Sequence, residues 1–273
     1  MNYKNQNYSY NLKGRTAIIT GGSSGIGFAI ARILGFYGCN LSIVGREPKK
    51  LNLSKKKLKS LNIKIILNNC DLTLPESAPK VIESTIQEYK KIDILINNVG
   101  GLPSSGSFLD LTDEDWIQSF QLNLMSNIRI TKAAIPYLQK SKAPRIINIS
   151  SFVAKQPGNF NPHYSVFKAG ILNLTKHLSN ILAIDKILVN SISPGNIVTE
   201  NWNDYITKKS EVERIARIQI EKQENKRVTE PTPLKRMGKP IEIASLVAFL
   251  SSDQAAFITG ENFNIDGGRV KTI

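Results

Sequence analysis

The sequence predicts an α/β fold of the Rossmann type, with one doubly wound parallel sheet in a single domain. Short apolar runs rich in β-branched residues alternate with helical segments along most of the chain, which favours parallel strands joined by helices. The first apolar run leads directly into a glycine-rich turn. Polar residues follow the ends of several strands, and the ligands of such sheets bind beyond the carboxyl ends of the strands.

Length and composition agree with this prediction. The chain has 273 residues, of which 41% are hydrophobic and 21% charged, an ordinary globular balance that argues against disorder. It contains no run of about 18 apolar residues, and residues 1–11 lack the apolar core of a signal peptide. We expect residues 1–11 to form a flexible arm and residues 12–273 to form the domain.

The two cysteines, Cys39 and Cys70, lie in expected core-strand surroundings and have no metal-ligand spacing. Few cysteines without such spacing are typical of a reduced compartment. We therefore expect a cytoplasmic protein without a bound metal.

The formal net charge of +14 has two interpretations. It could attract nucleic acid, acidic carrier proteins or anionic cofactors, or it could be a lysine-rich solvated surface. The densest basic cluster, from Lys49 to Lys59, has no interleaved aromatic residues. We favour the solvated surface and predict neither a nucleic-acid nor a membrane partner.

The first βα unit contains a turn suited to phosphate binding. Thr16–Thr20 is a buried strand, and after the turn a helix runs from Phe28 towards Gly38. The glycines have the spacing G-x-x-x-G-x-G, and a strand, turn and helix in this order present backbone N–H groups and a positive dipole end to a phosphate. The candidate binding residues are Gly21, Ser23, Ser24, Gly25, Ile26 and Gly27.

The second strand, Asn40–Val44, should end beside the adenosine ribose of a bound dinucleotide. NAD-binding sites commonly place an acid there, whereas an arginine accommodates the 2′-phosphate of NADP. Gly45 supplies no carboxylate, and Arg46 supplies a guanidinium. NADP(H) is therefore the preferred cofactor, with NAD(H) as the alternative.

Further βα units follow in the same order. The expected strands are Ile63–Leu67, Ile92–Ile96, Arg145–Ile149, Ile187–Ile192 and Asn262–Ile265. The expected helices run from Pro75 to Tyr89, from Thr112 to Leu138, from Pro162 to Ala183 and from Ile241 to Leu250. Such alternation predicts a parallel sheet covered on both faces.

Tyr164 and Lys168 lie one turn apart on one face of an expected helix. A phenol with its usual pKa of about 10 is a poor acid–base group at neutral pH, and an ammonium nearby stabilises the phenolate. Alone, such a pair is a common coincidence. Beside a dinucleotide site it indicates a proton donor.

Residues 199–232 form a polar, charged segment that follows a strand end. We expect two helices in it, at Asp204–Lys209 and Glu211–Asn225, and interpret the segment as a helical substrate lid. Trp202 and Tyr205 are candidate substrate contacts. The alternative is a solvent-exposed insertion without ligand contact.

From Leu12 to Gly268 the chain resembles the short-chain dehydrogenase/reductase family. Thr20–Gly27 is similar to the cofactor motif of the family, and Asn97–Gly100 is similar to its Asn-Asn-Ala-Gly element, with Val for Ala. Residues 257–260 and 265–268 match its C-terminal signature. Ser151 has the usual spacing to Tyr164, thirteen residues before it, and is chosen over Ser150.

The resemblance implies a dinucleotide-binding catalytic domain, an NAD(P)-dependent oxidoreductase that transfers a hydride between NADP(H) and a ketone or secondary alcohol. It implies that Ser151 and Tyr164 hydrogen-bond the reacting oxygen, with Tyr164 transferring the proton. Lys168 would lower the tyrosine pKa and hold the nicotinamide ribose, and Asn123 would support a water-linked proton path. The remaining implied cofactor contacts are Asp71, Leu72, Asn98, Gly100, Pro194, Gly195, Ile197 and Thr199.

Within the family the chain is most similar to bacterial carbonyl reductases that include the 3-oxoacyl-[acyl-carrier-protein] reductases. This implies a small-molecule substrate, with a carrier-linked 3-oxoacyl thioester as one candidate, and a homotetramer or homodimer. An NAD-dependent alcohol, sugar or steroid dehydrogenase is the first alternative. The second is a non-catalytic dinucleotide-sensing or nucleic-acid-associated protein, which would have no need of a proton donor. His163 is expected at the pocket edge and His177 at the surface or an interface, neither of them catalytic.

Overall fold

The computed structural model describes residues 10–272. The expected flexible arm therefore lies outside the described residues, apart from its last two positions. One of these, Tyr10, packs on the body of the protein, because its ring contacts Tyr37 edge-on at 5.4 Å and approaches Phe249 at 6.1 Å between centroids.

The described residues form one parallel sheet with the strand order β3-β2-β1-β4-β5-β6-β7. The predicted fold class is confirmed. The strands are β1 (Thr16–Thr20), β2 (Asn40–Gly45), β3 (Ile65–Asn69), β4 (Ile94–Asn97), β5 (Arg145–Ile149), β6 (Leu188–Pro194) and β7 (Asn262–Ile265).

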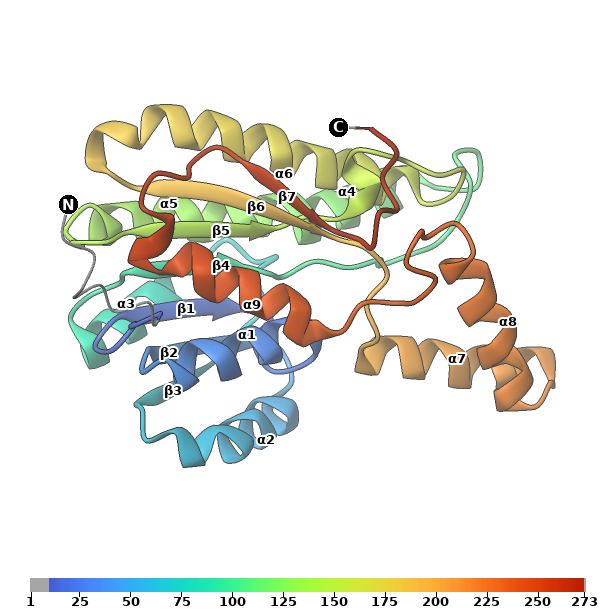
Figure 1. Ribbon diagram of the computed structural model, residues 1–273, viewed down its shortest axis with the longest axis horizontal. Coiled ribbons are helices and arrows are strands. Elements are labelled where there is room, and N and C mark those ends of the chain that lie inside the picture. The colour runs from blue at the N-terminus through green and yellow to red at the C-terminus, as the bar shows by residue number, and fades with distance from the viewer. Residues whose placement is uncertain (1–9, 273) are drawn as a thin grey trace.

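Helices cover both faces of this sheet (Figure 1). Successive side chains of a strand point to opposite faces, so Ile18 of β1 joins the apolar cluster under α3, α5 and α6, whereas Ile19 joins the cluster under α1, α2 and α9. The bounds of the helices are α1 (Gly25–Phe36), α2 (Pro48–Leu58), α3 (Ser77–Tyr89), α4 (Asp113–Phe120), α5 (Ser126–Leu138), α6 (Pro162–Ile181), α7 (Glu200–Glu213), α8 (Arg217–Thr229) and α9 (Pro240–Ser251).

The direction of winding changes between β1 and β4, which are neighbours in the sheet but not in the sequence. Chains that leave β1 and β4 turn away from each other, and this leaves a crevice at the carboxyl ends of the strands. The crevice explains why the polar residues found after several strands come together in space.

The third strand begins two residues later than the sequence predicts, at Ile65. Asn62 adopts a left-handed backbone with φ of 50°, so the chain is still turning where the strand was expected to start. Ile63 instead belongs to the packing around α1, because it lies against Gly35. The apolar run that begins at Ile63 is therefore divided between the packing around α1 and the strand β3.

The long helix expected from Thr112 to Leu138 is interrupted by a π-helical turn at Gln121–Met125. Thr112 begins α4 with a capping box, since its hydroxyl accepts a hydrogen bond from the Asp115 amide and the Asp115 carboxylate accepts one from the Thr112 amide. π-Helical turns occur frequently at functional sites. This one contains Asn123, whose side chain is fully buried.

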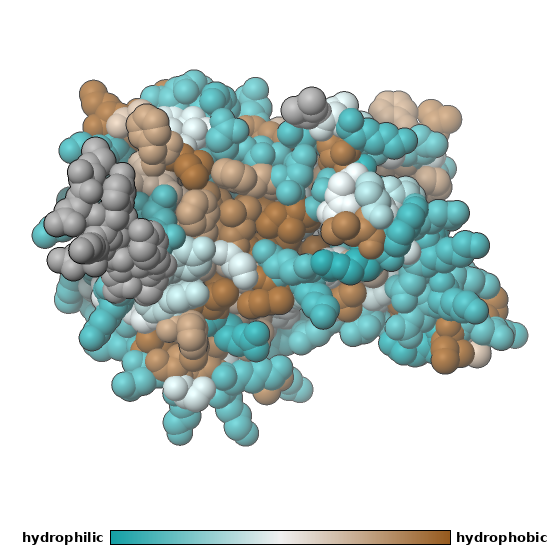
Figure 2. Space-filling view, viewed as in Figure 1, coloured by the Kyte–Doolittle hydropathy of each residue, from teal (hydrophilic) through white to brown (hydrophobic). Residues whose placement is uncertain are grey.

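The segment at 199–232 folds into α7 and α8, which project from the body of the protein in Figure 1 and present a mainly hydrophilic surface in Figure 2. The first helix is longer than expected, whereas the second is shifted towards the C-terminus and two residues shorter. The break between them falls at Arg214, with φ of 55°, instead of near residue 210. Buried Glu224 of α8 joins the two, because its carboxylate contacts Lys209 Nζ of α7 and Arg227 Nη2, each at 2.6 Å.

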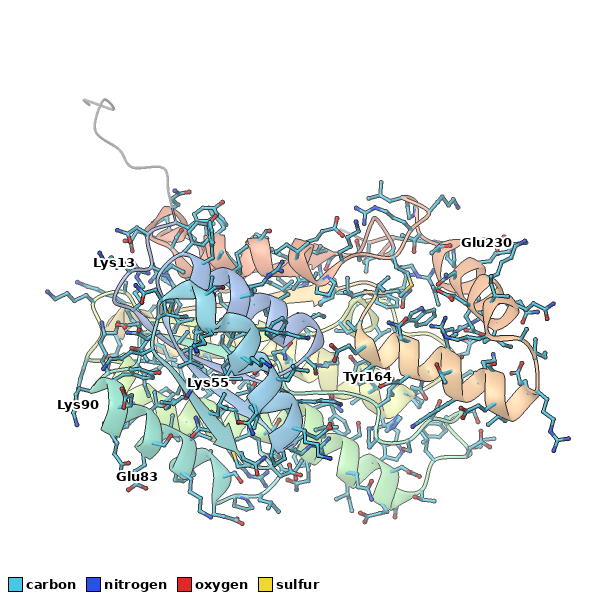
Figure 3. All side chains as sticks on the ribbon, turned by 90° about the horizontal axis from the view of Figure 1, so that it is seen from below. Lys13, Lys55, Glu83, Lys90, Tyr164 and Glu230 are labelled. Atoms are coloured by element: carbon cyan, nitrogen blue, oxygen red, sulfur yellow. The ribbon has the colours of Figure 1, made fainter. Side chains whose placement is uncertain are left out.

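No helix within residues 10–272 is long and apolar enough to cross a membrane. The lysines of the basic cluster on and after α2 are mainly exposed, and Lys13 and Lys90 lie at the periphery in Figure 3 while Tyr164 lies in the interior. The described residues also contain no group of three or more His, Cys, Asp or Glu side chains that could hold a metal ion.

Candidate functional site

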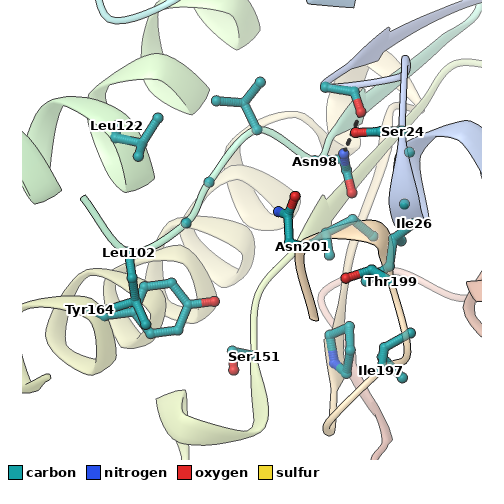
Figure 4. Close-up of a pocket in the computed structure, with 18 of the residues that line it drawn as sticks. Ser24, Ile26, Asn98, Leu102, Leu122, Ser151, Tyr164, Ile197, Thr199 and Asn201 are labelled. Carbon is teal, nitrogen blue, oxygen red and sulfur yellow. Dashed lines mark hydrogen bonds between the residues drawn. The ribbon is translucent and has the colours of Figure 1, made fainter. Parts of the chain in front are cut away.

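A cavity of about 920 Å³ occupies the crevice at the carboxyl ends of the strands (Figure 4). It extends from the glycine-rich turn after β1 to the N-terminal turn of α6, and the start of α7 borders it. The sequence-predicted residues that line it are Gly21, Ser23, Ser24, Gly25, Ile26, Gly27, Arg46, Asp71, Leu72, Asn98, Gly100, Ser151, Tyr164, Lys168, Pro194, Gly195, Ile197 and Thr199. Asn123 lies behind its wall.

The glycine-rich turn leaves no room for a side chain at its first and last glycines, Gly21 and Gly27. A Cβ on Gly27 would lie 2.1 Å from the Gly21 carbonyl oxygen, and Gly21 itself has a left-handed backbone with φ of 62°. The turn leads into α1, whose first turn has no acidic residue and whose Ser24 cap makes no side-chain hydrogen bond. The first amides of α1 are therefore left for an anion, as a dinucleotide pyrophosphate requires.

Asn98 holds the turn against the end of β4. Its Nδ2 donates to the carbonyl oxygens of Thr20 at 3.0 Å and Gly21 at 3.2 Å. Its own amide donates to the Thr20 hydroxyl at 2.8 Å. These bonds tie the two strands on either side of the crevice together and fix the shape of the turn.

Arg46 and Asp71 lie at the ends of neighbouring strands and approach each other, with 3.6 Å between Arg46 Nη1 and Asp71 Oδ2. Arg46 remains 66% exposed, so its guanidinium is available to a further anion. Burial raises the pKa of the Asp71 carboxyl, but hydrogen bonds from Thr73 and the Arg46 charge outweigh it and hold that pKa below its usual range. The Asp71 carboxyl is therefore charged at neutral pH.

Tyr164 and Lys168 share the cavity-facing side of α6, as their spacing predicts. Lys168 Nζ lies 5.6 Å from the centroid of the Tyr164 ring and donates to the Ile149 carbonyl oxygen at 2.9 Å. Burial lowers the pKa of Lys168 to about 8. The ammonium is therefore the main form at neutral pH, although it costs free energy to bury.

The pKa of Tyr164 moves in the direction opposite to the one expected from its lysine neighbour. Burial raises the pKa of the phenol, and the Ser151 hydroxyl only partly offsets this. The spacing of the two residues reveals the nearby charge but not the loss of water around the phenol. The result is a phenol that stays protonated at neutral pH, the form that can donate a proton.

The two consecutive serines after β5 have different surroundings. Ser150 donates through its hydroxyl to the Lys168 carbonyl oxygen at 2.8 Å and so fastens the strand to α6. The Ser151 side chain lies on the same side of the cavity as the Tyr164 hydroxyl (Figure 4), and its oxygen accepts a hydrogen bond from the Val153 amide at 3.4 Å. This arrangement supports the choice of Ser151.

Asn123 holds the backbone of the loop that follows β4. Its Oδ1 accepts from the Gly101 amide, and its Nδ2 donates to the Gly101 carbonyl, both at 2.9 Å. A Cβ on the preceding Gly100 would lie within 3 Å of both Asn123 Oδ1 and Lys168 Nζ. Asn123 therefore holds the loop at Gly100 and Gly101 in place next to the Lys168 ammonium.

The two histidines stand apart from the cavity. His163 is fully buried and does not line it, contrary to the expected place at the pocket edge, because its ring packs on Trp116 with centroids 6.1 Å apart. Burial lowers the pKa of His163. His177 is exposed on the later part of α6.

The segment at 199–232 borders one side of the cavity. Thr199, the N-cap residue that precedes α7, lies over the glycine-rich turn, since a Cβ on Gly25 would be 3.5 Å from its Cγ2. Of the two aromatic lid residues singled out in the sequence, Trp202 lines the cavity and Tyr205 does not.

Several cavity residues were not predicted from the sequence. They are Phe152, Phe160, Arg227 and Arg269. Phe152 follows Ser151 directly, which could have identified it. Arg269 comes from the tail beyond β7, and only the folded chain brings it here.

Fold and cavity together define a dinucleotide-dependent oxidoreductase. A sequence model of the family described as "Enoyl-(Acyl carrier protein) reductase" matches residues 21–269. The chain is 35% identical over 259 residues, 94% of its length and 97% of the relative, to the 3-oxoacyl-[acyl-carrier-protein] reductase of Rickettsia felis. It is 32% identical to tropinone reductase-like 3 of Erythroxylum coca, over 94% of this chain and 93% of that one. The chain belongs to the short-chain dehydrogenase/reductase family and is an NAD(P)-dependent enzyme of it.

Solved structures agree with this assignment. The L-sorbose reductase of Gluconobacter frateurii, solved in complex with NADPH and L-sorbose, superimposes with a TM-score of 0.91 at 30% identity, covering 97% of this chain and 99% of that one. A single-residue variant of the actinorhodin polyketide ketoreductase, solved with NADPH, superimposes with a TM-score of 0.86 at 29% identity, covering 94% of this chain and 98% of that one.

Proposed function

We propose that the protein interconverts a ketone and a secondary alcohol with NADP(H), and that reduction is its favoured direction at neutral pH. The observation that carries this proposal is the shared cavity, with a protonated phenol at one end and an anion-binding turn beside an exposed arginine at the other. The enzyme class is that of the family. The substrate class and cofactor choice are the proposal.

The residues present fit a dinucleotide. The turn at Gly21–Gly27 would hold the pyrophosphate, Asp71 and Leu72 the adenine end, and the loop at Gly100 with Pro194 and Thr199 the nicotinamide end. When bound, the nicotinamide supplies or accepts the hydride.

Tyr164 and Ser151 would act on the oxygen of the substrate. Their hydroxyls hydrogen-bond the carbonyl oxygen, and Tyr164 donates its proton as negative charge develops there. Lys168, charged at neutral pH and 5.6 Å from the ring centroid, then stabilises the phenolate that remains. Asn123 keeps the loop at Gly100 in place and would support the return of the proton through water.

Arg46 supports the choice of NADP(H) over NAD(H). Arg46 is exposed at the end of β2, and Gly45 stands where NAD-binding sites commonly have a carboxylate. In addition, two structurally similar proteins were solved with NADPH. An arginine–phosphate pair is a charge-assisted hydrogen bond.

Replacing Arg46 by alanine is therefore expected to raise the Kd for NADPH by about 10- to 100-fold and to leave the Kd for NADH nearly unchanged. Titration of each cofactor by quenching of tryptophan fluorescence measures both constants. Arg32→Ala, which removes an exposed arginine of α1, is the matched control. Equal losses for the two cofactors would place the 2′-phosphate elsewhere.

A substrate panel tests the proposed function. Oxidation of NADPH is followed with simple ketones, a ketose and a 3-oxoacyl thioester. These compounds are chosen because the similar proteins are named as reductases of different carbonyl compounds. We expect turnover with at least one neutral ketone. No NADPH oxidation with any carbonyl compound in the panel would contradict the proposal.

A further inference from the structure

Arg269 is a cation at the wall of the cavity. Its Nε and Nη1 are buried and make no hydrogen bond to any residue the structure describes. No carboxylate within residues 10–272 lies at ion-pair distance from it, and its Cζ lies 5.6 Å from the centroid of the Phe152 ring. Two buried guanidinium N–H groups without an acceptor are costly, and they point to a ligand that would accept hydrogen bonds from them.

Two other cations of the cavity are neutralised by carboxylates. Arg227 donates through Nε and Nη2 to the Glu224 carboxylate, at 2.8 and 2.6 Å. Lys50 Nζ pairs with the Glu47 carboxylate at 2.9 Å. Each of these two cations therefore already has a carboxylate at hydrogen-bond distance.

The remaining cavity cations already have places in the proposed reaction. Arg46 approaches Asp71 at the cofactor end. Lys168 lies against the Tyr164 ring and donates to a backbone carbonyl. Among the described residues that line the cavity, Arg269 is thus the cation that has neither a carboxylate at ion-pair distance nor a place in the proposed reaction.

The position of Arg269 is fixed by the tail that carries it. Asp266 accepts hydrogen bonds from the amides of Gly268 and Val270, at 2.9 and 2.8 Å, so its carboxylate is occupied by backbone. The Lys271 amide donates to Gln156 Oε1 at 2.8 Å. The tail is therefore tied to the segment that follows the catalytic serine, which places Arg269 at the substrate end of the cavity.

We propose that Arg269 binds an anionic group of the substrate, so that the preferred substrates are carbonyl compounds that carry a carboxylate. This inference rests on the proposed ketone reductase function and deepens it. A carboxylate gives a planar guanidinium a charge-assisted, directional partner. Phe152 beside the guanidinium and Trp202 from the lid provide apolar surface for the carbon chain between the carboxylate and the carbonyl.

A binding experiment tests this assignment without turnover. The protein is saturated with the oxidised dinucleotide, NADP+, and titrated by calorimetry with straight-chain methyl-ketone acids of increasing length and with the methyl ester of each. We expect at least one acid to bind about 30-fold more tightly than its ester in the wild type. In Arg269→Gln the acid and the ester of that pair should bind within about threefold of each other.

Two further variants separate recognition from general charge and from structure. Lys271→Gln removes an exposed cation two residues away and should keep the wild-type preference for the acid. Arg269→Lys, which keeps the charge but loses the planar fork, should keep only part of it. Equal binding of every acid and ester by the wild type would overturn the proposal, as would an acid preference that survives in Arg269→Gln.

The failure of this inference and the failure of the proposed function are distinguishable. If the protein turns over neutral ketones but shows no preference for acids, it is a ketone reductase in which Arg269 has a structural role. That result contradicts the anion site but not the proposed function. Tight binding of acids that depends on Arg269, without NADPH oxidation by any carbonyl compound, supports the anion site and contradicts the reaction.

Discussion

Tyr164→Phe is expected to lower kcat for ketone reduction by about a thousandfold, with less than about a threefold change in the Kd for NADPH. Phenylalanine fills the same space but has no proton to donate, and general acid catalysis typically contributes between about a hundred- and ten-thousandfold. Because burial keeps the phenol protonated, the loss should be nearly constant across neutral pH. Steady-state kinetics and cofactor titration measure the two quantities separately.

Tyr89→Phe provides the matched control for this experiment. Tyr89 is also partly buried, and its hydroxyl donates to the Leu41 carbonyl oxygen at 2.9 Å, on α3 and away from the cavity. Removing that hydroxyl should leave kcat unchanged. If Tyr164→Phe keeps the activity of this control, Tyr164 is not the proton donor.

Lys168→Met is expected to abolish most of the activity and to make the protein more stable. The ammonium is nearly completely buried, and its pKa of about 8 against an ordinary 10.5 means that the folded state disfavours the charge. That difference corresponds to about 3 kcal/mol, from which the lost hydrogen bond to Ile149 subtracts about 1–2 kcal/mol. The variant should therefore gain about 1–2 kcal/mol at pH 7, a few degrees in Tm.

The pH dependence of that gain identifies its cause. Below pH 8 the lysine is charged in both the folded and the unfolded state, so the buried charge destabilises the wild type fully. Between pH 8 and 10.5 the folded state has released its proton while the unfolded state still binds one, and wild-type stability rises with pH.

The advantage of Lys168→Met should therefore be largest below pH 8 and disappear above about 10.5. Chemical denaturation at a series of pH values measures it, and Lys132→Met, at an exposed position of α5, should show no such trend. A constant difference between wild type and Lys168→Met across this range would mean that packing, not charge, decides the effect.

The sequence predicts the sheet well because the strands are short, apolar and separated by turns that break them cleanly. The third strand starts late because Ile63 is as apolar as a strand residue but packs on Gly35. The boundary at Arg214 was missed because a lysine- and glutamate-rich helix contains no glycine or proline where it ends.

Some features of the site can be predicted from the local sequence, whereas others depend on contacts between distant segments of the chain. Gly21, Gly25 and Gly27 can be recognised because their conformation or crowding excludes side chains at fixed spacing. The rise in the pKa of Tyr164 and the unpartnered guanidinium of Arg269 depend on burial, which is set by residues far away in the chain. The spacing of Tyr164 and Lys168 identifies the acid–base pair, but it does not reveal how far the two side chains are buried from water.

One measurement tests the central claim most directly. The protein is supplied with NADPH deuterated at both C4 positions and with a neutral ketone that it turns over, and the product is analysed by mass spectrometry and NMR. The account predicts a secondary alcohol with deuterium on the carbinol carbon, formed by the wild type and almost not at all by Tyr164→Phe. An alcohol without deuterium, or equal yields from the two proteins, would contradict it.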